Sequence, residues 1–146
     1  MSLITDKVFF NALKANSSIV EDTGGRIYNT AIPVPDEQVD KEPLPYIIIT
    51  FDGLNNEGYT KDNSFEGDDD NVQIGILVAA EDRENLGKLM QTIRHAVIDY
   101  FESDAHVKDD FDLIPESYVF SASNIQYDDQ KPCYFQTLVY ECETKP

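Results

Sequence analysis

Apolar residues near the start of the chain recur at helical spacing. The positions concerned are Ile4, Val8, Phe9, Ala12 and Leu13. Residues three and four apart share one face of a helix, and Asp6 would favour the positive N-terminal end of its dipole. The pattern therefore predicts a helix over about residues 5–15.

A second and longer amphipathic pattern occupies residues 82–102. Its apolar positions are Leu86, Met90, Ile93, Val97, Tyr100 and Phe101, and polar or charged residues fill the positions between them. A stripe of this width is typical of a helix that packs on a sheet. Glu84 and Lys88 are one helical turn apart and are expected to pair.

Four segments have the composition of strands. Residues 46–52 are rich in β-branched and aromatic side chains up to Asp52-Gly53, where we expect the strand to stop. Apolar residues alternate through 71–79, and two further strands are predicted at 117–127 and 133–142. Residues 128–132 would form the turn between the last two strands.

The stretch before the first of these strands, residues 16–45, contains Gly24-Gly25 and four prolines. Proline fixes φ and removes a hydrogen-bond donor, so this stretch is predicted to be a mostly extended connection with a short strand at 26–28. The whole pattern predicts one α+β domain over 1–146. Its elements would follow in the order αββαββ, with an antiparallel sheet of about four strands packed by two helices.

A long acidic loop is predicted between the first two main strands, over about residues 53–70. It is longer than a hairpin needs, and it carries Tyr59 and Phe65, which a solvating tract would not require. We interpret it as an arm that orders against a partner, the alternative being an insertion without a contact. Part of it, Asp62 to Gln73, resembles the first half of a calcium loop but lacks the closing glutamate.

The charge of the chain narrows the classes of partner. The formal net charge is -17, from 28 acidic and 11 basic residues. Such a chain repels nucleic acid and anionic membranes, which argues against sequence-independent DNA binding. An acidic surface is compatible with basic protein partners, with mimicry of DNA, or simply with solubility.

Signatures of catalysis and cofactor binding are missing from the sequence. It contains no GxSxG, phosphate loop, paired CxxC or HExxH. Cys133 and Cys142 lie on one predicted strand, about 30 Å apart, so they cannot pair, and free thiols favour a reducing compartment. His106 has no neighbour at ligand spacing. We expect no enzymatic activity, metal or cofactor, and no signal peptide or membrane span.

Three stretches in this order resemble the tail-completion, or tail-terminator, proteins of long-tailed bacteriophages. They are Gly25-Arg26-Ile27-Tyr28, Pro45-Tyr46 with the apolar strand after it, and Val72–Val78 followed by the amphipathic helix. The resemblance extends from about residue 5 to residue 143. The length of the acidic loop and the strongly negative charge depart from the family pattern.

This resemblance implies a structural protein of a phage or prophage virion, assembled in the host cytoplasm. Such subunits form a ring, expected to be a hexamer, that stops the tail tube and presents a surface to the head-tail connector. In that picture the candidate interface residues are Arg26 as an ion-pair donor, Tyr59 and Phe65 as anchors, and Asp68, Asp69 and Asp70 in the acidic loop. The alternatives are a monomeric acidic module that mimics DNA and an enzyme with an unrecognised carboxylate site.

Overall fold

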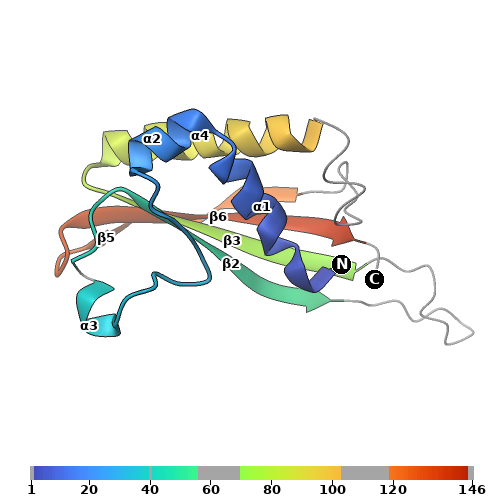
Figure 1. Ribbon diagram of the computed structural model, residues 1–146, viewed down its shortest axis with the longest axis horizontal. Coiled ribbons are helices and arrows are strands. Elements are labelled where there is room, and N and C mark those ends of the chain that lie inside the picture. Colours follow the sequence, from blue (N-terminus) through green and yellow to red (C-terminus); the bar gives the residue numbers. More distant parts are fainter. Residues whose placement is uncertain (1, 40, 56–69, 103–118, 145–146) are drawn as a thin grey trace, which may run out of the picture.

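A computed structural model describes residues 2–39, 41–55, 70–102 and 119–144 (Figure 1). In chain order the elements are the 3-10 turn η1 (Ser2–Ile4), α1 (Asp6–Lys14), α2 (Ser17–Thr23), β1 (Ile27–Asn29), α3 (Asp36–Val39), β2 (Tyr46–Asn55), β3 (Asp70–Ala80), α4 (Arg83–Glu102), β4 (Val119–Ala122), β5 (Gln126–Asp128) and β6 (Cys133–Thr144). The α+β class is therefore confirmed, but the order contains more elements than the predicted αββαββ.

The described strands form one six-stranded mixed sheet in the order β1-β2-β3-β6-β4, with β5 also paired to β6. β1 runs parallel to β2, and every other pair is antiparallel. The prediction of a purely antiparallel sheet is wrong at this edge. β1 is only three residues long, and the direction in which it pairs depends on the route of the chain after α2, which no local pattern records.

The centre of the sheet follows the predicted alternation. Ile47 pairs with Val78, and Ile76 pairs with Leu138, so apolar side chains from three strands share one face. β2 does not stop at Asp52-Gly53 as expected. A bulge between Phe51 and Gly53 accommodates the extra residue, and the strand continues to Asn55. The connection to β3 is thereby confined to residues 56–69, which lie outside the described residues.

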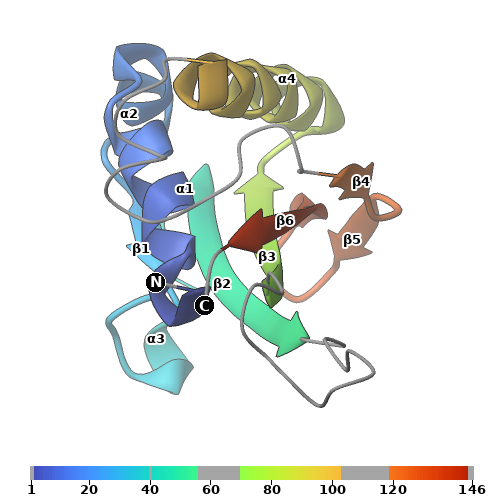
Figure 2. The same cartoon turned by 90° about the vertical axis from the view of Figure 1, so that its right-hand side faces the viewer.

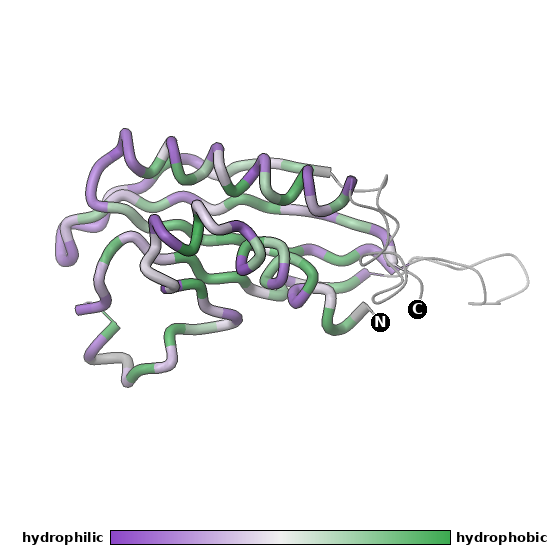
Figure 3. Tube along the Cα trace, turned by 45° about the horizontal axis from the view of Figure 1, so that its top comes forward, coloured by the Kyte–Doolittle hydropathy of each residue, from purple (hydrophilic) through white to green (hydrophobic). Residues whose placement is uncertain are grey.

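Helices α1, α2 and α4 cover one face of the sheet, and the main core lies between these two layers (Figure 1). Figure 3 shows the apolar side of α4 turned toward the strands and its polar side turned away. At the centre of this core the ring of Phe9 lies 5.5 Å from that of Phe101 and 5.2 Å from that of Tyr140. The periodicities of the first and last helices thus predicted which faces are buried, except at Ile4, which lies in η1 and is 39% exposed.

Helix α2 corrects the prediction that residues 16–45 are mostly an extended connection. The side chain of Asn16 caps its first turn by accepting a hydrogen bond of 3.1 Å from the amide of Ile19. Gly24 ends the helix in the left-handed conformation at φ 61°. Seven residues gave too short a periodic pattern to be recognised, although both capping signals are in the sequence.

Residues 30–39 and 41–45, here called the crossing segment, cover part of the opposite face of the sheet and contain α3 (Figure 1). Lys131, in the turn between β5 and β6, holds this segment in place. Its Nζ donates to the carbonyl oxygens of Val39 at 3.2 Å and Glu42 at 2.6 Å. The hydroxyl of Tyr28 also donates to the Glu42 carboxylate. A small second core forms beneath it around Ile32, Tyr46 and Ala79.

The strand predicted at 117–127 is two strands, β4 and β5, which pair with different parts of β6. Ser123 lies in the break between them. Its amide donates 2.9 Å to the carbonyl oxygen of Thr137, and its hydroxyl oxygen accepts from the Thr137 amide. These local bonds hold the bend against β6 while the chain changes partners.

Candidate assembly surfaces

Arg26 stands at the entry to β1, and its guanidinium bonds within the chain. Nε donates to the carbonyl oxygen of Pro45 at 3.1 Å, and Nη2 donates to that of Leu44 at 3.3 Å. The backbone carbonyl of Arg26 accepts from the amide of Ile47 at 3.0 Å. The side chain expected to make an ion pair between subunits thus fixes the approach of the crossing segment to β2.

The two glycines before Arg26 form the turn that leads from α2 into β1. Both have positive φ, 61° at Gly24 and 81° at Gly25. A Cβ at Gly24 would lie 2.6 Å from Nη1 of Arg26, so a larger residue would displace the guanidinium. Gly24-Gly25-Arg26 thus forms a backbone turn whose guanidinium is directed at carbonyl oxygens.

Of the candidate interface residues in the acidic loop, the structure describes only Asp70. It begins β3, lies opposite Thr144 of β6, and is only 7% exposed. Tyr59, Phe65, Asp68 and Asp69 lie outside the described residues, as does the first half of the calcium-like stretch. Asp70 is therefore part of the sheet and offers little surface to a partner.

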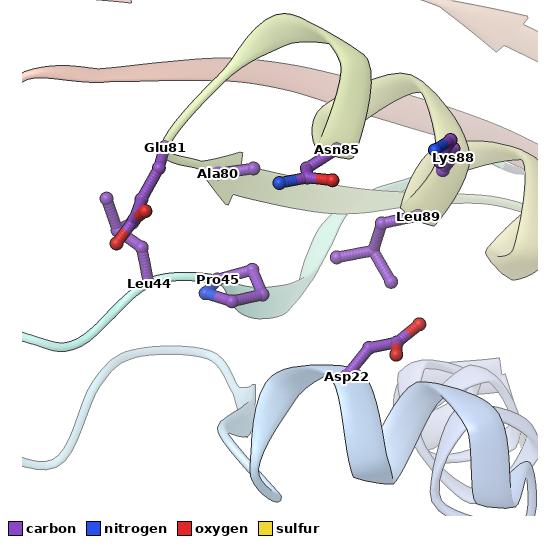
Figure 4. A pocket seen from close by; sticks show the side chains of 8 residues that line it. All are labelled: Asp22, Leu44, Pro45, Ala80, Glu81, Asn85, Lys88 and Leu89. Atoms are coloured by element: carbon purple, nitrogen blue, oxygen red, sulfur yellow. The ribbon is translucent and has the colours of Figure 1, made fainter.

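A pocket of about 380 Å³ lies between α2, the end of the crossing segment, the end of β3 and the first turns of α4 (Figure 4). Pro45, Leu89 and Ala80 give it apolar walls. The carboxylates of Asp22 and Glu81 stand at its rim, and both residues are exposed. We call this feature the acidic pocket.

Two further polar residues line the acidic pocket, Asn85 and Lys88, and both have their side chains bonded to residues at the start of α4. The amide nitrogen Nδ2 of Asn85 donates to the Asp82 carboxylate at 2.8 Å. The Nζ of Lys88 lies 3.2 Å from a carboxylate oxygen of Glu84, which confirms the predicted pair. Because Lys88 is paired with Glu84, the charge that the pocket presents is dominated by Asp22 and Glu81.

A contrasting surface lies on the other side of α4, along β4, β5 and the start of β6. Arg94 stacks over the ring of Phe120, with Cζ 4.3 Å from the ring centre. Arg83, Tyr127 and Tyr134 line a second pocket of about 380 Å³, and the two tyrosine rings are 4.9 Å apart. We call these five residues, together with Ile125, the arginine–aromatic flank.

The arginine–aromatic flank was not recognised in the sequence, although part of its signal was present. Arg83 and Arg94 are eleven residues apart, about three helical turns, so they lie on one stripe of α4. The sequence has three arginines, and the third, Arg26, bonds inside the fold. The tyrosines come from strands whose placement against α4 could not be predicted. Tyr127 is 55% exposed and Ile125 is 38% exposed, so these two neighbours offer apolar surface beside Arg83.

Both cysteines are free and buried, at opposite ends of β6. Burial raises the pKa of Cys142 to about 12, with a further contribution from Glu141. Burial, followed by the nearby Asp128, also raises the pKa of Cys133. A thiol with a raised pKa is a poor nucleophile, so neither residue is suited to covalent chemistry.

Among residues 2–39, 41–55, 70–102 and 119–144, no three His, Cys, Asp or Glu side chains are grouped closely enough to hold a metal ion. Within those same ranges, no helix is both long and apolar enough to cross a membrane.

The fold itself has a close counterpart. The chain superposes on a chain of a structure titled "Virion of native gene transfer agent (GTA) particle", with a TM-score of 0.69. The match covers 97% of this chain and 94% of the other, at 11% sequence identity. No family model matches the sequence, and no curated protein matches it. At this identity the likeness establishes a shared fold along nearly the whole length of both chains.

Proposed function

We propose that the chain is a structural subunit of a phage or phage-like virion, acting by protein–protein assembly and not by catalysis. The observation that carries this proposal is the fold shared with a chain of a gene transfer agent virion over 97% of the protein. An independent line of support is the sequence resemblance to tail-completion proteins in Gly25–Tyr28, Pro45-Tyr46 and Val72–Val78.

Within the particle, the subunit completes the tail. Copies assemble as a ring, a hexamer in this proposal, on the head-proximal end of the tail tube, where the ring ends tube growth and meets the head-tail connector. The partners are thus other copies of the chain, the tube subunits and the connector, and the ring is assembled in the bacterial cytoplasm. A net charge of -17 suits a ring through which DNA passes, because like charges give no counterion-release gain.

Two parts of the chain are proposed to contact partners in the ring: residues 56–69 and Arg26. Residues 56–69 serve as an arm in which Tyr59 and Phe65 anchor a partner, with Asp68 and Asp69 supplying charge. Nε and Nη2 of Arg26 each donate one hydrogen bond, to Pro45 and Leu44. The other N–H donors of the guanidinium would bond to a carboxylate of the adjacent subunit.

The deciding experiment removes the gene from the phage or prophage that encodes it and examines the particles by electron microscopy. We expect tails of irregular length that are not joined to heads, with uniform joined tails restored by supplying the gene in trans. Normal particles without the protein would contradict a tail-completion role. A monomer that binds basic nucleic-acid proteins tightly would instead support the DNA-mimic alternative.

A further inference from the structure

The acidic pocket and the arginine–aromatic flank lie at the same end of the fold but on opposite sides of it. Both adjoin the junction of β3 and α4, since Glu81 and Arg83 are two residues apart. The rest of the pocket is lined by α2 and the residues just before β2, and the rest of the flank lies on β5 and the start of β6. In the sheet order these are opposite sides of β3, and Figure 2 shows α2 and β1 across the molecule from β4 and β5.

The two surfaces are complementary in charge, and both combine charged groups with apolar side chains. The pocket has apolar walls and a rim of two carboxylates, Asp22 and Glu81. The flank presents two arginines among exposed apolar and aromatic side chains. An arginine can lay its aliphatic stem on apolar walls while its guanidinium bonds to carboxylates, and tyrosine and arginine supply most of the energy in protein interfaces.

We propose that the arginine–aromatic flank of one copy docks on the acidic pocket of the next copy, with Arg83 directed at Asp22 and Glu81. The occupant is a second copy of this chain because one molecule offers both halves of the contact. Two different surfaces on opposite sides make a heterologous, head-to-tail contact, and repeating it generates a ring when the rotation closes. The inference rests on the proposed function, to which it adds the surfaces that join neighbouring subunits.

Charge also explains why this contact would be specific. Copies with a net charge of -17 repel one another in most orientations. The flank places two of the chain's three arginines on one side. The orientation that brings the flank of one copy to the carboxylates of the next is therefore favoured over all others.

The test exchanges charges across the contact. In one variant Arg83→Glu reverses the flank, and in another Asp22→Lys with Glu81→Lys reverses the pocket. The exposed positions are suited to these changes: glutamate is favourable at the first residue of α4, and lysine is favourable near the end of α2. Control variants apply the same charge changes elsewhere, Lys7→Glu on α1 and Asp99→Lys with Glu102→Lys at the far end of α4.

Self-association is measured by sedimentation velocity over a range of concentrations, after circular dichroism has shown that each variant is folded. We expect each interface variant to associate on the order of tenfold more weakly than the wild type or its matched control. An equimolar mixture of the two interface variants should regain association, since each junction then pairs opposite charges.

Three results would overturn the contact: a wild type that is monomeric at every concentration, interface variants that associate like the wild type, or a mixture that stays as weak as its components. The proposed function can fail separately. If wild-type rings cap purified tail tubes although the charge reversals have no effect, the contact is wrong and the function stands. If the mixture is restored but the assembly does not bind tail tubes, the contact stands and the function is wrong.

Discussion

Nε of Arg26 donates a hydrogen bond of 3.1 Å to the carbonyl oxygen of Pro45, nineteen residues later in the chain. The same guanidinium reaches Leu44, so one side chain joins the start of β1 to the start of β2. These two bonds fix the position of the last residues of the crossing segment, just before β2 begins. It also positions Leu44 and Pro45, which form one wall of the acidic pocket.

Arg26→Lys tests this role in stability. An ammonium group cannot reproduce the planar arrangement of two donors, so we expect the variant to lose about 1–3 kcal/mol of unfolding free energy. The measurement is equilibrium unfolding in urea. Arg83→Lys is the matched control, because Arg83 is exposed, and its change should stay within about 0.5 kcal/mol. Equal effects at the two positions would show that the Arg26 bonds contribute little.

The contrast between Arg26 and Arg83 also shows what the sequence could predict. Helices α1 and α4 and strand β3 are long enough to display their periods, and their buried faces were predicted, whereas β2 and β6 were predicted as strands without a single buried face. Arg26 was predicted to be an ion-pair donor between subunits, but its partners Leu44 and Pro45 lie far along its own chain, and only the fold brings them together. Local pattern carries no record of such long-range placement.

The assembly surfaces were less predictable for the same reason. The acidic pocket takes its lining from α2, β3, α4 and the segment before β2, and α2 itself was too short to be recognised. The arginine–aromatic flank depends on the break between β4 and β5, which turns Tyr127 toward Tyr134. Only the stripe formed by Arg83 and Arg94 could have been found from spacing.

The hydroxyl of Tyr28 predicts how stability depends on alkaline pH. Burial, and then the hydrogen bond to Glu42, raise the pKa of Tyr28 to about 12. Because the folded pKa lies above the unfolded value of about 10, the stabilisation is fully present below pH 10 and is lost between pH 10 and pH 12. We expect the unfolding free energy of the wild type to fall more steeply across this window than that of Tyr28→Phe. Parallel pH profiles for the two proteins would contradict this assignment.

The buried cysteines predict resistance to thiol reagents. Cys142 is 1% exposed and Cys133 is 3% exposed, and burial raises both pKa values. In a spectrophotometric assay with Ellman's reagent at pH 8, we expect neither thiol to react quickly in the native protein and both to react in urea. Ser121→Cys adds a thiol on the exposed strand β4 and should react at once. Rapid labelling of the native wild type would mean that β6 opens readily at one of its ends.

The hairpin of β2 and β3 allows the arm hypothesis to be tested without disturbing the core. The two strands remain paired as far as Asn55 and Asn71, so residues 56–69 can be replaced by Asn-Gly, which together with Asp70 makes a three-residue hairpin loop. Shortening a loop costs little stability, and we expect an unfolding free energy within about 1 kcal/mol of the wild type. Ring formation and tube capping should be lost if Tyr59 and Phe65 anchor a partner.

Variants that keep the loop at full length distinguish the effect of its side chains from the effect of removing the loop. Tyr59→Ser with Phe65→Ser should weaken ring formation as strongly as the replacement, because aromatic anchors supply most of the contact energy. Asp68→Asn with Asp69→Asn should weaken it less, since charges at the edge of an interface mainly affect the rate of association. Sedimentation velocity measures ring formation, and tail-tube length in electron micrographs measures tube capping. Unchanged rings and tube lengths in the replacement variant would show that residues 56–69 make no essential contact, and assembly would then depend on surfaces of the described fold.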